Sequence, residues 1–255
     1  MVTVVLLPGM DGTGDLFAPF VAALGPMIRT VVVSYPTDAA LDYQALETVA
    51  RKALPTDGPY VLLGESFSGP IALSLAASCP PGLAGVVLCA TFAKNPVPLL
   101  RPVRALAAIT PFELAPAWLV GKFLMGRHAS PELGRLLHAA LAKVSGTALR
   151  ARASAILGVD VVAKLRTVQV PVLYLQATED RLIKDASAQV ITRALPSVEL
   201  VRIEAPHLLL QVAPAAAASA VAAFCARAEA VWRSVAATTE GPDDRTRTDS
   251  FSHQQ

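Results

Sequence analysis

The sequence has little charge, few aromatic residues and few cysteines. Charged residues make up 16% of the 255 residues and aromatic residues 5%, whereas 53% are hydrophobic. This balance excludes a disordered polyelectrolyte, and the length suits one large domain or one domain with an insertion. Lys and Arg number 22 against 20 Asp and Glu, which leaves a net charge of +2 and no basic run. Because nucleic-acid-binding proteins usually carry a basic excess or stripe, we expect no nucleic-acid partner.

The three cysteines are too scattered for a disulfide framework or a metal site. Cys79, Cys89 and Cys225 each lie in an apolar stretch, which predicts small buried side chains. We therefore expect no metal site, and we expect no organic cofactor either.

Signals for export or membrane insertion are also weak. The apolar run Val2–Leu7 has no basic residues before it and favours a strand over a signal peptide. The longest uncharged stretch, Ala205–Ala226, contains two prolines, a histidine and a glutamine, and its second half is rich in alanine. It therefore predicts no membrane-spanning helix, and we expect a cytoplasmic protein.

Short β-branched runs alternate with helical stretches along most of the chain. The predicted strands are Val2–Leu7, Thr30–Tyr35, Tyr60–Gly64, Gly85–Thr91, Val170–Gln176 and Val198–Ile203. The predicted helices between and after them are Leu16–Leu24, Tyr43–Leu54, Phe67–Ser78, Asp185–Leu195 and Pro214 to about Ala236. Continuous apolar strands, covered on both faces and alternating with helices, indicate an α/β protein with a doubly wound, mostly parallel sheet.

This alternation stops between Lys94 and about Val168, where prolines punctuate helical segments and no strand-like run occurs. We predict helices at Trp118–Gly126, Pro131–Lys143 and Thr147–Lys164. The predicted organisation is a core of residues 1–93 and 166–237, a helical cap of residues 94–165, and a flexible polar tail of residues 238–255.

The strongest chemical signal is the sequence Gly64-Glu65-Ser66-Phe67-Ser68-Gly69, placed where a predicted strand ends and a helix begins. A sharp strand-to-helix turn of this kind is a nucleophile elbow. It forces the serine into a sparsely allowed backbone conformation and requires small neighbours, as Gly64 and Ser68 are. The turn exposes the Ser66 hydroxyl at a helix N-terminus, where unpaired amides favour negative charge. A Gly/Ser-rich loop that only caps a helix is the alternative.

A glycine-rich turn, Pro8 to Gly14, follows the first strand. It lacks the lysine of a phosphate-binding loop, and its glycine spacing does not fit a dinucleotide-binding loop. A backbone amide of this turn, together with that of Phe67, would form an oxyanion hole. We expect Asp11 to bond its own backbone, as turn aspartates do, although a carboxylate of the site is the alternative.

An acid and a base follow later strands. Asp180 comes after the strand that ends at Gln176, and His207 after the strand that ends at Ile203. Both fall at the sheet edge expected for Ser66, and the order Ser, Asp, His is that of the α/β-hydrolase triad. Glu179 is a rival acid because it is the immediate neighbour of Asp180.

With these motifs, the chain resembles the α/β-hydrolase superfamily, in particular small bacterial esterase-like members with a helical cap, over nearly all of residues 1–237. The stretches LLPGMDGTG, LLGESFSGPIALSLAA, PVLYLQATEDRLI and PHLLLQVAP carry the resemblance. Three features depart from the pattern: Pro8-Gly9 replaces His-Gly before the oxyanion residue, Ser68 stands where Gly is common, and no antiparallel hairpin precedes the first strand.

The resemblance implies Ser66 as nucleophile, His207 as base, Asp180 as its acid partner and the amides of Met10 and Phe67 as oxyanion donors. The implied reaction is hydrolysis of small to medium apolar carboxylic esters through an acyl-enzyme. An acyltransferase, or a binding receptor without turnover, is the alternative. The predicted cap supplies Phe112, Trp118, Phe123, Leu124 and Met125 as an apolar wall for the substrate, unless these side chains only pack the cap onto the core.

Overall fold

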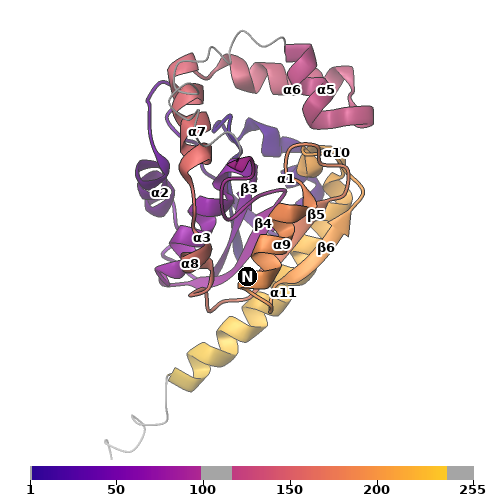
Figure 1. Cartoon of the computed structure of the whole chain (residues 1–255). Helices are drawn as coiled ribbons and strands as arrows, with labels where there is room; N and C mark the ends of the chain where they lie inside the picture. The colour runs from indigo at the N-terminus through magenta and orange to yellow at the C-terminus, as the bar shows by residue number, and fades with distance from the viewer. Residues whose placement is uncertain (1, 99–116, 240–255) are drawn as a thin grey trace, which may run out of the picture.

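Six parallel strands form the centre of the computed structural model, which describes residues 2–98 and 117–239 (Figure 1). The strands are β1 (Thr3–Leu7), β2 (Arg29–Val32), β3 (Tyr60–Glu65), β4 (Leu83–Cys89), β5 (Val172–Ala177) and β6 (Glu199–Ile203). They lie in the order β2-β1-β3-β4-β5-β6, and every neighbouring pair is parallel. The predicted fold class is confirmed.

Helices cover both faces of the sheet. Helices α1 (Ala18–Leu24) and α11 (Pro214–Thr239) pack on one face, and α2 (Tyr43–Lys52), α3 (Gly69–Ala77), α8 (Val162–Leu165) and α9 (Asp185–Ala194) pack on the other. Strands β1, β3, β4 and β5 are buried along their whole length, as continuous apolar runs predict. The expectation that Thr30–Tyr35 forms a buried strand is wrong, because β2 lies at the sheet edge and Val32 is 42% exposed.

Three helices, α5 (Ala117–Met125), α6 (Pro131–Ala142) and α7 (Gly146–Gly158), form a layer beyond the sheet edge at which the strands end (Figure 1). We call them the cap helices. A short 3-10 turn, η5 (Gly126–His128), follows α5. Ser130 and Ser145 cap the N-termini of α6 and α7 by accepting a backbone N–H three residues on.

The single helix predicted over Thr147–Lys164 is wrong, because the structure breaks it into α7 and α8. The backbone between them pairs with the segment that leaves β4. The Asn95 N–H donates to the Val159 carbonyl at 2.9 Å, and the Val161 N–H donates to the Ala93 carbonyl at 2.8 Å. These bonds to a distant segment replace helical bonds, which local sequence does not reveal.

Helix α11 is long and apolar enough to cross a membrane by length and composition alone. Ala217, Val221 and Phe224 on it are nevertheless buried against the sheet, as in a core helix. The helix continues to Thr239, so the predicted tail begins inside it, and residues 240–255 lie outside the described residues.

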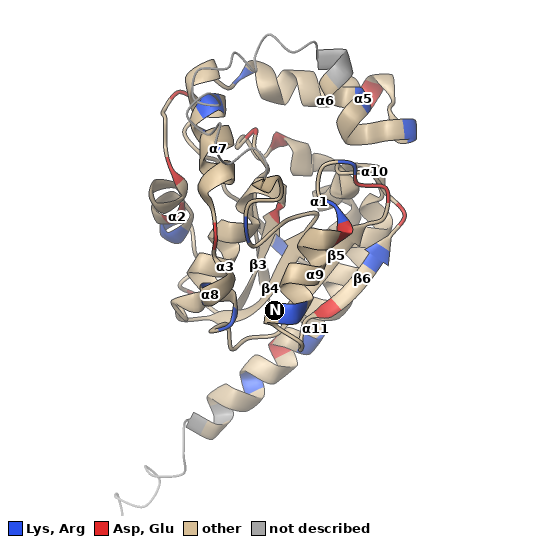
Figure 2. Ribbon diagram, in the orientation of Figure 1, with Lys and Arg blue, Asp and Glu red and all other residues tan. Residues whose placement is uncertain are grey.

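Two of the three cysteines are buried as expected. Cys89 and Cys225 lie in the core, whereas Cys79 is exposed just after α3, so the expectation of burial is wrong there. Figure 2 shows Lys and Arg interspersed with Asp and Glu along the ribbon, in keeping with the absence of a basic run in the sequence.

Candidate active site

The candidate site lies where the sheet topology changes direction. The chain passes from β1 outward to β2 on one side, and from β3 outward to β4, β5 and β6 on the other. In open α/β sheets, ligands bind beyond the carboxyl ends of the strands at such a switch point. The loop after β1 carries Met10, and the turn after β3 carries Ser66. The two strands end side by side, with Leu7 paired to Gly64.

Ser66 occupies the strained turn that the sequence predicts. Its φ is 48°, in the left-handed region that residues with a Cβ rarely adopt, and it opens the 3-10 turn η2 (Ser66–Ser68) before α3. Gly64 is required by space, because a Cβ there would lie 2.8 Å from the Ser68 carbonyl oxygen and 2.9 Å from Ala72 Cβ. A Cβ on Gly69 would overlap the Thr91 side chain. The absence of side chains at Gly64 and Gly69 therefore lets the backbone make this tight turn.

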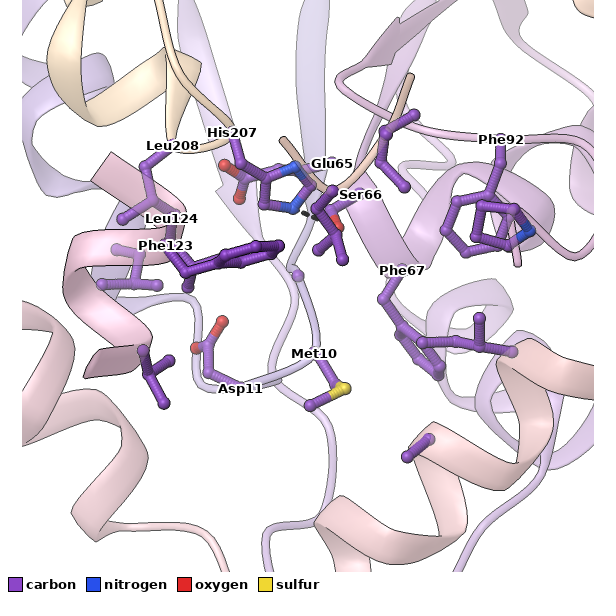
Figure 3. Close-up of a pocket in the computed structure, with 18 of the residues that line it drawn as sticks. Met10, Asp11, Glu65, Ser66, Phe67, Phe92, Phe123, Leu124, His207 and Leu208 are labelled. Carbon is purple, nitrogen blue, oxygen red and sulfur yellow. Dashed lines mark hydrogen bonds between the residues drawn. The ribbon is translucent and has the colours of Figure 1, made fainter. Parts of the chain in front are cut away.

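The structure brings Ser66, His207 and Asp180 into one hydrogen-bonded series. Ser66 Oγ lies 2.8 Å from His207 Nε2 (Figure 3). On the other side of the ring, His207 Nδ1 lies 2.7 Å from Asp180 Oδ2. The Asp180 and His207 side chains are only 2% and 6% exposed. The other carboxylate oxygen of Asp180 accepts the backbone N–H groups of Leu182 and Ile183. These bonds fix the carboxylate, which in turn orients the imidazole.

Glu179, the rival acid, faces a different partner. Its carboxylate lies 3.0 Å from His128 Nε2 and also pairs with Arg127, both in η5. It therefore links the loop after β5 to the turn that follows α5. The side chain of Asp11 bonds its own turn, as expected, because its Oδ2 accepts from the N–H of Thr13 at 2.9 Å and from its hydroxyl at 2.6 Å.

The two amides expected to stabilise an oxyanion both belong to residues that line the cavity beside Ser66. Phe67 is the second residue of η2, so its N–H has no partner within the turn. The Ser66 carbonyl accepts the Thr91 hydroxyl. Because a trans peptide is planar, with its carbonyl and N–H pointing in opposite directions, Thr91 also fixes the direction of the Phe67 N–H.

Ser68, which departs from the resemblance, is fully buried and ties the two loops together. Its hydroxyl donates to the Pro8 carbonyl and therefore accepts the Tyr35 hydroxyl at 2.8 Å. Burial raises the pKa of the Tyr35 phenol, which keeps it protonated as a donor. The serine thus links the elbow to the start of the loop that carries Met10.

Glu65 is a buried carboxyl beside the nucleophile that the sequence analysis did not single out. It is 3% exposed, and its Oε1 accepts from Gln211 Nε2 at 3.0 Å. Burial raises the pKa of the Glu65 carboxyl to about 7, and the nearby Asp11 charge adds to the effect, whereas the hydrogen bond from Gln211 and His207 oppose it. Nothing in the sequence distinguishes it from an ordinary residue of the elbow.

A cavity of about 800 Å³ opens from Ser66 and His207 toward the cap helices (Figure 3). Its volume is within the range of small-molecule sites. Its cap-side wall consists of the apolar residues Val120, Phe123, Leu124, Leu137, Leu141, Ala153, Ile156 and Leu157. Among the described residues that line it, only Asp11 and Glu65 are acidic.

The predicted apolar wall is partly right. Phe123 and Leu124 line the cavity, on the side opposite Phe67 and Phe92 in Figure 3. Met125 does not line it: the side chain is 3% exposed and packs in a cluster with Leu16, Leu137 and Leu208. The next position along a helix turns by about 100°, which carries Met125 away from the cavity. Phe112 and the side chain of Trp118 lie outside the described residues.

Within the described residues, no group of three or more His, Cys, Asp or Glu side chains is placed to hold a metal ion. The site as described offers a serine, a base, an acid and amide donors beside an apolar cavity. This arrangement is suited to nucleophilic attack on an acyl carbonyl.

A family model described as serine aminopeptidase, S33, matches residues 29–209, which include Ser66, Asp180 and His207. No curated protein matches the chain.

Many solved structures share the fold. The enol-lactonase from Burkholderia xenovorans LB400 is 20% identical, with 88% of this chain and 90% of that chain covered, at a TM-score of 0.76. A thermophilic esterase from Thermogutta terrifontis is 19% identical, with 90% and 91% covered, at a TM-score of 0.78. An esterase from Exiguobacterium antarcticum is 16% identical, with 88% and 92% covered, at a TM-score of 0.76. At these identities, the likeness shows the α/β-hydrolase fold alone.

Proposed function

The chain belongs to the serine aminopeptidase, S33, family of α/β-hydrolases, and from this membership we propose that it is a serine carboxylesterase acting on apolar esters. The observation that carries the proposal is the series from Ser66 Oγ through His207 to Asp180 at the mouth of an apolar cavity. The proposed catalytic residues are Ser66, His207 and Asp180.

In the proposed reaction, His207 Nε2 takes the Ser66 proton as Oγ attacks the ester carbonyl carbon. The carbonyl π electrons move to oxygen and give a tetrahedral oxyanion. Asp180 holds the tautomer whose Nδ1–H faces the carboxylate and stabilises the imidazolium that forms. His207 then returns the proton to the leaving alkoxide as the C–O bond breaks. Water, activated by the same histidine, hydrolyses the acyl-enzyme.

The proposed oxyanion donors are the amides of Met10 and Phe67. The Met10 N–H makes no hydrogen bond within the described residues, so it is available to a ligand. Preorganised amides of this kind supply a large share of transition-state stabilisation in acyl transfer, since they do not reorganise as charge develops.

The cavity favours an ester with an apolar group over a peptide with a free amino terminus. An ammonium group would need a carboxylate partner beside the scissile bond. Asp11 is engaged by Thr13, and Glu65 is bonded to Gln211 with its pKa raised to about 7. The apolar wall between the cap helices and the core instead matches an aliphatic or aromatic group of small to medium size.

Turnover of p-nitrophenyl acetate, butyrate and octanoate tests the proposal directly. The wild type should hydrolyse all three, and Ser66→Ala should lose about 10⁴- to 10⁶-fold in kcat, as triad knockouts do. A sulfonyl fluoride should label Ser66 stoichiometrically. Alanine p-nitroanilide serves as the peptide control and should be cleaved poorly. Loss of less than tenfold in Ser66→Ala, or labelling at another residue, would contradict the assignment.

The same acyl-enzyme would also serve an acyltransferase, and a receptor on this scaffold would bind without turnover. Adding butanol to the reaction with the octanoate ester distinguishes an acyltransferase from a hydrolase. Acyl transfer to butanol yields butyl octanoate in place of free octanoic acid. A single stoichiometric release of p-nitrophenol would indicate the receptor.

A further inference from the structure

Arg152, on cap helix α7, is a charged side chain in an unexpected place. It is 1% exposed and among the largest fully buried side chains of the described residues. None of its hydrogen bonds within the described residues goes to a carboxylate. Its Nη1 donates to the carbonyls of Met10 at 2.9 Å and Asp11 at 2.8 Å, and its Nη2 donates to the Pro36 carbonyl at 2.8 Å.

Burying a guanidinium that bonds no carboxylate directly is costly, and the nearby Asp11 charge offsets only part of that cost, so its three carbonyl partners need an explanation. An apolar residue would fix α7 to the core without that cost. Two of the three partners lie in the loop after β1, next to the amide proposed as an oxyanion donor. The guanidinium carbon also lies 5.9 Å from the centre of the Tyr35 ring, and the hydroxyl of Tyr35 donates to Ser68.

The bonds of Arg152 lead through two peptide planes to the Met10 N–H. Arg152 holds the Asp11 carbonyl, which fixes the plane of the Asp11–Gly12 peptide and so the direction of the Gly12 N–H. That N–H donates to the Gly9 carbonyl at 3.1 Å. The Gly9 carbonyl and the Met10 N–H share the next peptide plane and point in opposite directions, since the described residues have no cis peptide.

Gly12 shows how closely the loop is fitted to the arginine. Its φ is +71°, and a Cβ there would lie 2.5 Å from Arg152 Nη1. Glycine suits both this backbone conformation and the space that the guanidinium takes. The carbonyl of Gly12 is held from the core, by the Tyr35 N–H at 2.7 Å.

We propose that Arg152 is a positioning residue for the oxyanion hole: through Asp11, Gly12 and Gly9 it sets the direction of the Met10 N–H. The inference rests on the proposed function. Aligned hydrogen bonds polarise one another, so the cation also strengthens the Met10 N–H as a donor. Arg152 thus acts on the reacting carbonyl only through the Met10 N–H and does not contact the substrate. In this proposal, the packing of α7 against the loop completes the oxyanion hole.

The test compares Arg152→Met and Arg152→Lys with Lys143→Met. Lys143 is a matched control, because it also joins a cap helix to the core, through Asp15 at 2.6 Å, but bonds no carbonyl of the loop. Active sites are counted by complete reaction with a p-nitrophenyl phosphonate. Then kcat per titrated site and KM are measured on p-nitrophenyl acetate, whose acyl group is too short to reach the cap wall.

We expect Arg152→Met to lower kcat per site about 10- to 100-fold with KM within threefold, because a misaligned donor is lost mainly in the transition state. Affinity for a trifluoromethyl ketone, which forms a tetrahedral oxyanion on Ser66, should fall in parallel, while affinity for the matching methyl ketone stays. Arg152→Lys, which keeps the charge and reaches fewer carbonyls, should lie between Met and wild type. Lys143→Met should keep kcat within twofold.

A role limited to folding predicts fewer titrated sites and a lower unfolding temperature with kcat per site unchanged, and that result overturns the inference. Equal losses in Lys143→Met and Arg152→Met would also overturn it. If Arg152→Met yields no titratable protein, Arg152→Lys decides: an unchanged kcat overturns the inference, and a loss of threefold or more at an unchanged unfolding temperature supports it. Absence of ester turnover and titratable serine in the wild type would instead overturn the proposed function, and this inference with it.

Discussion

Asp180 Oδ2 lies 2.7 Å from His207 Nδ1, whereas the carboxylate of the preceding residue, Glu179, lies against His128 in η5. Two neighbouring acids thus have separate partners. The first orients the imidazole that faces Ser66, and the second bonds a residue beside the cap helices.

Exchanging each acid for its amide separates the two roles. Asp180→Asn should lower kcat by about 10²- to 10⁴-fold on p-nitrophenyl butyrate, because an amide that donates to Nδ1 favours the wrong tautomer. Glu179→Gln, the matched control, should change kcat less than threefold. Steady-state kinetics on both variants, with circular dichroism to verify folding, checks the prediction. A larger loss in Glu179→Gln would reassign the acid.

Glu65 should make stability depend on pH. The pKa of its carboxyl is raised from 4.5 to about 7 by burial, so the folded state holds the proton that the unfolded chain releases. Its contribution to the free energy of unfolding is therefore fully present below about pH 4.5 and is lost as the pH rises to about 7. The change is on the order of 3 kcal/mol. Glu65→Gln, which cannot ionise, should lose that dependence.

The measurement is the free energy of unfolding in urea at pH 5, 6, 7 and 8. The difference between Glu65→Gln and wild type should move in favour of the variant as pH rises. Glu132→Gln, exposed on α6, is the control and should follow the wild type throughout. A constant difference between Glu65→Gln and wild type would show that Glu65 is ionised in the same range in both states.

Phe123 should govern preference for chain length. Phe123→Ala removes part of the cavity wall, so kcat/KM should fall most on the octanoate ester, by about 1–3 kcal/mol of transition-state stabilisation, and least on acetate. Met125→Ala is the comparison, because that side chain packs away from the cavity. It should lower the unfolding temperature and reduce all three rates in equal proportion. Parallel losses in Phe123→Ala would refute the wall assignment.

Ser68 should matter more to stability than its partner Tyr35. Ser68→Ala leaves both the Pro8 carbonyl and the Tyr35 hydroxyl buried without this partner, at a cost of about 1–3 kcal/mol each. Tyr35→Phe leaves the bond from Ser68 to Pro8 in place and should cost less. In the Tyr35→Phe background, Ser68→Ala should lower the free energy of unfolding by less than it does in the wild type. The reason is that no buried phenol hydroxyl then loses its hydrogen-bond partner. Urea unfolding of the four proteins gives the coupling, and strict additivity would contradict it.

The sheet and the positions of Ser66, Asp180 and His207 could be predicted from sequence for a simple geometric reason. Parallel strands place their carboxyl ends at one edge, so polar residues that directly follow apolar runs converge there whatever their separation in the chain. The choice between Asp180 and Glu179 could not be made this way, because adjacent residues of one loop differ only in the direction of their side chains.

The features missed in the sequence depend on contacts between distant segments. In the sequence, Arg152 cannot be distinguished from an exposed arginine of a helix. Only the structure shows that its helix lies against the loop at Met10 and Asp11. Gly158 is a local stop signal at the end of α7 that the sequence analysis did not use, and the backbone bonds of Val159 and Val161 to the segment after β4 cannot be seen in the sequence. Phe123 and Met125 are equally apolar, and only the orientation of α5 assigns them to different environments.

The backbone bonds of Asn95 to Val159 and of Val161 to Ala93 have a consequence for how such a chain can change. The chain leaves the sheet after β4 and returns toward β5 at adjacent points, which these bonds hold together. Because these two points are adjacent, the order of the six strands does not depend on the segment between them, and a change in the length of that segment leaves the order unchanged. The proposed role of Arg152 adds one requirement: an exchanged segment must again supply a cation to the carbonyls of Met10, Asp11 and Pro36.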